Sequence, residues 1–143
     1  MKKKQCLSAL LAFALLMSCA APSLADAPSD DLIRSMIVIS IGTSLDQYEH
    51  TVTVLNGTAV LKISPGLPDS VMQMARSSPD IMSAWENVRS SYIGLSNSGS
   101  SLLKSLGAEN GAFIIIITDR PSDPGGEVYL MVVNGTILQD FLY

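Results

Sequence analysis

Hydrophobic residues form short runs in the last third of the chain, separated by polar turns. One run is Phe-Ile-Ile-Ile-Ile-Thr at 113–118, and the next is Val-Tyr-Leu-Met-Val-Val at 128–133. β-Branched residues favour an extended chain, and runs this short suit buried strands better than helices. An Asn-Gly pair at 134–135 then precedes an apolar stretch, and this is the strongest short-range signal for a β-hairpin. The C-terminal third is therefore predicted to be sheet.

A second hairpin is predicted earlier in the chain. Residues 51–55 and 58–63 are rich in β-branched residues, and Asn56-Gly57 lies between them. Both turn residues accept a positive φ angle, which the tightest hairpin turns require. Pro65 and Gly66 then end the sheet segment.

A long helix is predicted between the two hairpins. Ser78-Pro79-Asp80 supplies a cap, a proline at the first helical position and an acid in the first turn. Residues at spacings of three and four form one apolar face ending before Gly107: Ile81, Trp85, Val88, Tyr92, Leu95, Gly99, Leu102 and Leu106. Glycines and short polar residues at 94–99 weaken a helix and predict a kink or break there. Trp85 and Tyr92 are expected to pack against the isoleucine strand, the alternative being an exposed aromatic patch.

The segments on either side of the first hairpin are less regular. Ser29-Asp30-Asp31 indicates a helix start. The β-branched residues at 36–41 favour one helical turn that leads into a strand ended by Gly42, the alternative being a short helix. A short helix is predicted over 69–76. The predicted fold is α+β with two layers: an antiparallel sheet of four or five strands, and one long or kinked helix plus a short helix on one face.

The N-terminus has the pattern of a bacterial export signal. Three lysines precede an apolar run at 7–17, and small residues lead to Ala25. Residues 1–25 are predicted to be the signal, 26–31 a linker, and 32–143 a single domain. Two outcomes are open: cleavage after Ala25 releases a secreted protein, or the lipobox-like Leu-Met-Ser-Cys at 16–19 leads to a lipid on Cys19 and a cell-surface anchor.

Removal of the leader changes the chemistry of the chain. Both cysteines are lost if the chain begins at Asp26, so neither a disulfide nor a thiol nucleophile is expected. Three lysines are also lost, which leaves 6 basic and 13 acidic residues and a formal net charge of −7. This charge argues against nucleic acid as a partner, and against any membrane contact other than through a lipid on Cys19.

Candidate chemistry is sparse. The sequence contains no phosphate-binding glycine loop, nucleophile elbow or paired metal-binding histidines, and the only histidine, His50, is expected to be an ordinary strand residue. Asp119, Asp123 and Glu127 are spaced by four in a loop rich in proline and glycine. They are the candidate Ca²⁺ ligands, since Ca²⁺ prefers carboxylate oxygens; the alternative is a solvated hairpin loop.

The chain resembles a class of small exported proteins and lipoproteins of unknown function from anaerobic Gram-positive bacteria. The features that carry the resemblance are the leader with Cys19, the serine-rich helix ending at Leu106-Gly107, and the C-terminal segment 132–140. The resemblance implies export and no particular activity, so it assigns no catalytic residue.

Taken together, these patterns predict an exported, non-catalytic binding or surface-interaction module. Its partner would be an extracellular protein or a small ligand, contacted through a strand edge or a helix face. The alternative is a cation-dependent ligand binder or enzyme that uses the 119–127 loop, with or without His50. A third hypothesis is a dimer formed through the apolar face at 81–106.

Overall fold

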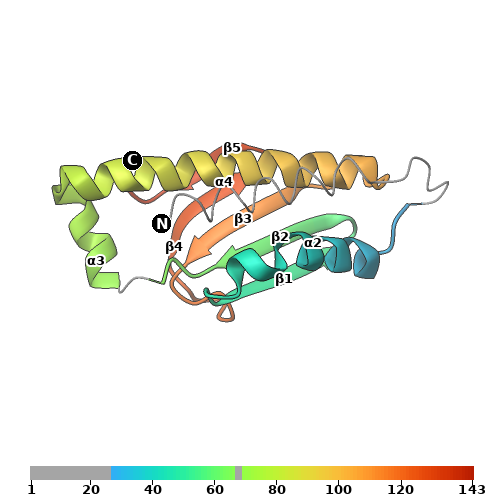
Figure 1. Cartoon of the computed structure of the whole chain (residues 1–143), viewed down its shortest axis with the longest axis horizontal. Coiled ribbons are helices and arrows are strands. Elements are labelled where there is room, and N and C mark those ends of the chain that lie inside the picture. The colour runs from blue at the N-terminus through green and yellow to red at the C-terminus, as the bar shows by residue number, and fades with distance from the viewer. Residues whose placement is uncertain (1–26, 67–68) are drawn as a thin grey trace.

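The computed structural model describes residues 27–66 and 69–143 of the chain (Figure 1). Its elements are, in order, helix α2 (Asp30–Leu45), strands β1 (His50–Leu55) and β2 (Thr58–Ile63), helix α3 (Asp69–Met74), the 3-10 helix η1 (Ala75–Ser77), helix α4 (Pro79–Ser105), and strands β3 (Phe113–Thr118), β4 (Val128–Val133) and β5 (Thr136–Asp140). The strands form one five-stranded sheet in the order β1-β2-β3-β4-β5. The predicted α+β class is confirmed.

The sheet is mixed, which corrects the expectation of antiparallel pairing throughout. β1–β2, β3–β4 and β4–β5 are antiparallel, but β2 and β3 pair in parallel, with Ala59 opposite Phe113 and Ile63 opposite Ile117. Parallel neighbours need a crossover connection, usually a helix. Here α3 and α4 form it: α4 returns the chain to the end of the sheet where β2 began (Figure 1).

Both predicted Asn-Gly hairpins are confirmed. Asn56 and Gly57 have φ angles of 51° and 76°, and Asn134 and Gly135 have 48° and 80°. These left-handed conformations match the twist of the flanking strands, which is why a two-residue turn can close each hairpin.

The predicted strand at 36–41 is wrong, because this segment belongs to α2. The helix start was predicted correctly: the Ser29 hydroxyl accepts a hydrogen bond from the N–H of Leu32 at 3.2 Å. The helix then continues to Leu45, so it begins inside the expected linker and extends past Gly42. Ile33, Ile37, Ile41 and Leu45 recur every four residues and are buried against the sheet. Burial of this stripe outweighs the strand preference of isoleucine.

Helix α4 is one helix of 27 residues, without the predicted break at 94–99. Its small residues allow close contact with the strands instead. A Cβ atom on Gly99 would fall against the ring of Phe113, far inside van der Waals contact. The buried Ser96 hydroxyl donates to the carbonyl of Phe113 at 3.2 Å and accepts from the N–H of Gly135 at 2.9 Å. The short side chains therefore fix α4 onto β3 and the β4–β5 turn.

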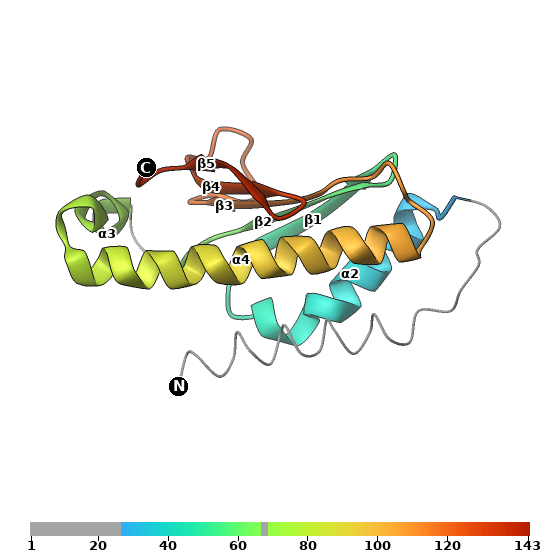
Figure 2. The ribbon, with the colours of Figure 1, turned by 90° about the horizontal axis from the view of Figure 1, so that it is seen from above.

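Helices α2 and α4 lie side by side on the same face of the sheet (Figure 2). Alternate residues of β2 and β3 point to these helices and are buried: Ala59, Leu61, Ile63, Phe113, Ile115 and Ile117. Trp85 packs with Ile117 and Leu130, and Tyr92 contacts both parts of the core, as predicted. The apolar face of α4 is thus used inside the domain. None of the described helices is long and apolar enough to cross a membrane.

Candidate functional site

Strand β1 forms an open and regular edge of the sheet. Its six residues pair with β2 without a register shift, and no other described strand pairs with its outer side. The sequence His-Thr-Val-Thr-Val-Leu contains no lysine, proline or other residue that commonly protects an edge. The outer side of β1 is therefore an unpaired and regular hydrogen-bonding edge within the described residues.

The register shows which backbone groups of β1 point outward. In an antiparallel pair, alternate residues bond to the partner strand. The N–H of Ser64 bonds to the carbonyl of Glu49, whereas the N–H of Ala59, opposite Val54, bonds away from β1 to Ala112. Thr51, Thr53 and Leu55 therefore bond to β2. Val52 and Val54 direct their N–H and C=O groups away from the sheet.

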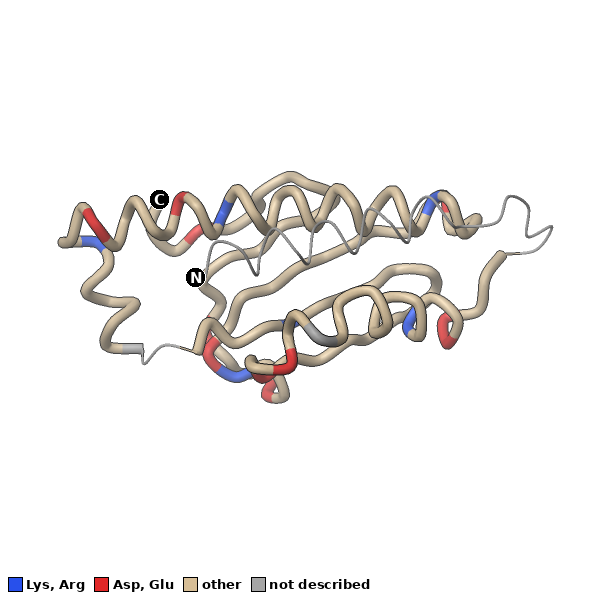
Figure 3. The backbone as a smooth tube through the Cα atoms, viewed as in Figure 1, with Lys and Arg blue, Asp and Glu red and all other residues tan. Residues whose placement is uncertain are grey.

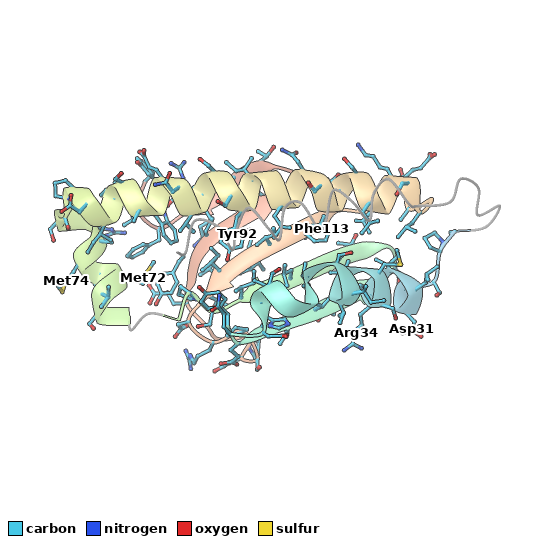
Figure 4. All side chains as sticks on the ribbon, viewed as in Figure 1. Asp31, Arg34, Met72, Met74, Tyr92 and Phe113 are labelled. Atoms are coloured by element: carbon cyan, nitrogen blue, oxygen red, sulfur yellow. The ribbon has the colours of Figure 1, made fainter. Side chains whose placement is uncertain are left out.

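A shallow groove runs between this edge and the flank of α2. A hollow of about 210 Å³ is lined by Asp30, Asp31, Arg34, Val52, Thr53 and Val54. A neighbouring hollow of about 390 Å³ is lined by Asp31, Arg34, Ser35 and Val38, which lie along one side of the helix. Figure 4 shows Asp31 and Arg34 on α2, with Arg34 directed outward past the sheet edge.

Asp30 fixes the geometry of this groove. Its two carboxylate oxygens accept hydrogen bonds from the N–H groups of Asn56 and Gly57, at 2.9 and 2.8 Å. The start of α2 is thereby held on the β1–β2 turn. The side chains of Asp31 and Arg34 form no hydrogen bond or ion pair with any described residue, so one acid and one base are available to a partner.

Both elements that border this edge carry exposed hydrophobic side chains. Leu55, on β1, is 68% exposed, and Ile39, on α2, is 66% exposed; Val38 is 44% exposed and Leu32 39%. Of these side chains, Val38 lines the groove itself, and covering an exposed aliphatic side chain there would gain free energy.

The opposite edge of the sheet, formed by β5, is irregular and tied to α4. The β4–β5 register shifts between Met131 and Val132. Asp140, at the end of β5, accepts a hydrogen bond from Trp85 Nε1 at 3.0 Å and pairs with Arg89 Nε at 2.6 Å. The Asp140 side chain is only 5% exposed. A register shift therefore makes this edge irregular, and a partly buried ion pair holds its end on α4.

The residues after β5 strengthen the same attachment. The Tyr143 hydroxyl donates to Glu86 at 2.8 Å, and the Arg89 guanidinium lies 4.6 Å from the centre of the Tyr143 ring. The hydrogen bond to Glu86 raises the pKa of Tyr143 above its ordinary value of 10.0. Arg76 bonds to the carbonyl of Phe141, at 2.6 Å from Nη2. The apolar C-terminus is packed against α4 and η1.

The 119–127 loop is organised around Arg120. Its guanidinium donates to Asp119 at 3.1 Å, to Asp123 at 2.8 Å and to the carbonyl of Gly125 at 3.0 Å. The second oxygen of Asp119 accepts the N–H of Glu127 at 2.6 Å. Burial acts to raise the pKa of Asp119, but the Glu127 N–H and Arg120 outweigh it and hold this pKa below its ordinary value of 3.8.

This loop lies against the start of β1, where Figure 3 shows acidic and basic residues together. Ser122 donates to Glu49 at 3.1 Å, which brings the loop next to His50, and a His50 ring nitrogen lies 2.9 Å from the carbonyl oxygen of Tyr48. Within the described residues, no three His, Cys, Asp or Glu side chains are grouped so as to hold a metal ion. Ca²⁺ binding by the loop stays a prediction.

The predicted signal at 1–25 and the candidate lipidation residue Cys19 lie outside the described residues. The groove itself was not predicted, because α2 was expected to become a strand. One signal was present in the sequence: Asp31, Arg34, Ser35 and Val38 have the spacing of one helix face.

Comparison with known proteins gives no independent assignment. No family model, curated protein or solved structure matches this chain significantly. Function must therefore be inferred from the fold and its surfaces.

Proposed function

We propose that this protein is an exported, non-catalytic interaction module that binds an extended polypeptide segment along the edge of β1. The observation that supports this function best is the difference in protection between the two edges: β5 is bulged and tied down, whereas β1 is regular and open. Proteins usually protect such edges because they template pairing with another chain.

Strand addition explains the groove as well as the edge. An incoming segment would bond to the outward N–H and C=O groups of Val52 and Val54, and these backbone contacts supply affinity. Its alternate side chains would point to the flank of α2, where Asp31, Arg34 and Val38 offer both charges and an apolar contact. Side-chain selection would come from this flank.

The alternative site, the acidic loop, has less support. Arg120 already occupies one oxygen of Asp119 and one of Asp123, and backbone N–H groups take the others at 2.6 and 2.8 Å. A cation would have to compete with these donors for the same carboxylate oxygens.

A proline substitution tests the strand-addition mechanism directly. The N–H of Val52 points outward, so Val52→Pro removes a donor that only a partner would use, in a position where edge strands tolerate proline. Val52→Thr keeps the N–H group and the branched shape, and is the matched control.

The probe is a display library of linear peptides, with selected peptides measured by titration. We expect Val52→Pro to weaken peptide binding at least tenfold and Val52→Thr to leave it within about threefold, since the lost contacts are backbone hydrogen bonds. Circular dichroism confirms that both variants fold. Equal binding by the two variants, or a protein that neither selects a peptide nor associates with itself, would contradict the proposal.

The location is tested separately by the intact mass of the protein recovered from its host. A lipidated form beginning at Cys19 would be found in the membrane fraction, and a form beginning at Asp26 in the medium. A full-length chain found only inside the cell would contradict export.

A further inference from the structure

We infer that the segment that pairs with β1 is β1 of a second copy of this chain, so that two five-stranded sheets join into one. This inference rests on the proposed function of the β1 edge and names its partner. The two strands would run antiparallel about a twofold axis near Thr53, as most homodimers are arranged about such an axis.

The register of β1 permits this pairing without a gap. Only residues whose backbone groups point outward can bond across the new edge, and these include Val52 and Val54. With the axis at Thr53, Val52 of each copy bonds to Val54 of the other. Thr53 then faces Thr53 of the second copy as a non-hydrogen-bonded pair, in which side chains approach most closely.

The charges beside the edge suit a self-pairing surface. An interface about a twofold axis must be complementary to itself. The groove flank carries one acid and one base, Asp31 and Arg34, both without a described partner. Two α2 helices brought together in opposite directions present the acid of one to the base of the other. A groove lined by charges of one sign would instead repel its own copy.

The exposed aliphatic residues also favour a second copy over an isolated peptide. Val38 lines the hollow beside Arg34, and Leu55 lies at the end of the free strand; they are 44% and 68% exposed. A single added strand would cover β1 and leave much of the helix in water. A second copy brings its own α2 alongside Val38, and on the other face of the sheet its Thr51 would lie opposite Leu55.

The first test is the mass of the protein in solution, as recovered from its host, measured by sedimentation velocity over a micromolar concentration series. We expect a monomer–dimer equilibrium. Asp31→Lys should weaken association about tenfold, because two symmetric charge pairs are replaced by repulsion. Asp31→Lys combined with Arg34→Glu should restore association, because the swapped charges are complementary again.

The second test fixes the surface and the register by disulfide trapping. Thr53→Cys places two thiols opposite each other and should give a covalent dimer under mild oxidation. Thr51→Cys is the matched control on the same strand face, because its two thiols would be about 14 Å apart. Gln139→Cys is the control on the β5 edge. Neither control should give more covalent dimer than the unsubstituted chain oxidised under the same conditions.

The outcomes separate this inference from the proposed function. A protein that stays monomeric, or a dimer that Thr53→Cys does not trap, would overturn the second-copy inference. If a monomer nevertheless binds library peptides in a manner abolished by Val52→Pro, the edge function stands and the partner is another protein. Retention on lipid vesicles, with no dimer and no peptide binding, would overturn both.

Discussion

The two edges of the sheet are built in opposite ways. The β5 edge contains a register shift, ends in a nearly buried aspartate and is held to α4 by Arg89, Trp85 and Tyr143. The β1 edge is regular, and α2 covers its inner face without covering its outer backbone groups. Both edges belong to Asn-Gly hairpins, so the turn chemistry does not cause the difference.

The difference comes from where the adjoining helix places its polar side chains. On α4, Arg89 and Trp85 point to the end of β5 and satisfy its carboxylate. On α2, Asp30 is used on the β1–β2 turn, and Asp31 and Arg34 face outward. Helix α4 therefore holds the β5 edge in place, whereas α2 leaves the outer backbone groups of β1 available to a partner.

The largest expected change in stability is at the β5 edge. Asp140→Ala leaves the Arg89 guanidinium and the Trp85 N–H without their acceptor, and removing one partner of a buried ion pair costs several kcal/mol. Because Arg89 is 26% exposed, we expect a loss of about 3 kcal/mol in the free energy of unfolding, measured in urea. Gln139→Ala, at an exposed neighbour, should change it by less than about 0.5 kcal/mol. Equal effects would mean that the edge is not held through Asp140.

A smaller change in stability should distinguish α4 from α2 when a glycine of each helix is replaced by alanine. Gly99→Ala in α4 forces a methyl group against the Phe113 ring and should destabilise the fold by about 2 kcal/mol. Gly42→Ala in α2 is the matched control, because no atom lies within 4 Å of its new methyl group. We expect it to stabilise by about 0.5 kcal/mol through helix propensity. Thermal denaturation of the two variants shows whether each substitution raises or lowers the melting temperature. A stabilising Gly99→Ala would show that α4 does not approach β3 closely.

The smallest effect is a pH dependence of the β5 attachment. The pKa of Tyr143 is raised in the folded state, so its hydrogen bond to Glu86 is fully present below pH 10 and is lost as the pH rises through the folded pKa. Tyr143→Phe should therefore have a lower melting temperature than the unsubstituted protein at pH 8, and the difference should shrink above pH 10. A difference that is constant with pH would exclude this hydrogen bond as its cause.

Much of the fold could be predicted from local chemistry. The Asn-Gly turns, the cap at Ser29 and the helix start at Pro79 each depend on a few neighbouring residues, and all are confirmed. Ser78 stands at the cap position but its side chain forms no cap hydrogen bond. The strands at 113–118 and 128–133 followed from their apolar runs.

The errors concern residues whose role depends on distant contacts. The isoleucines of α2 favour a strand locally, but a stripe at four-residue spacing is buried by the sheet. Gly99 and Ser96 weaken an isolated helix, yet Phe113 and Gly135 require small residues at these places. The groove beside β1 could not be predicted, because it needs α2 to be a helix and β1 to be an edge.

The parallel pairing of β2 with β3 divides the sheet into two locally closed halves. Each hairpin closes across a two-residue turn, whereas Ala59 and Phe113 meet only after the whole α3–α4 crossover has formed. Closing a loop of about fifty residues instead of two costs roughly 3 kcal/mol more in chain entropy. The junction between the halves is therefore the entropically expensive part of the sheet, and the contacts of α4 with β3 and the β4–β5 turn offset that cost.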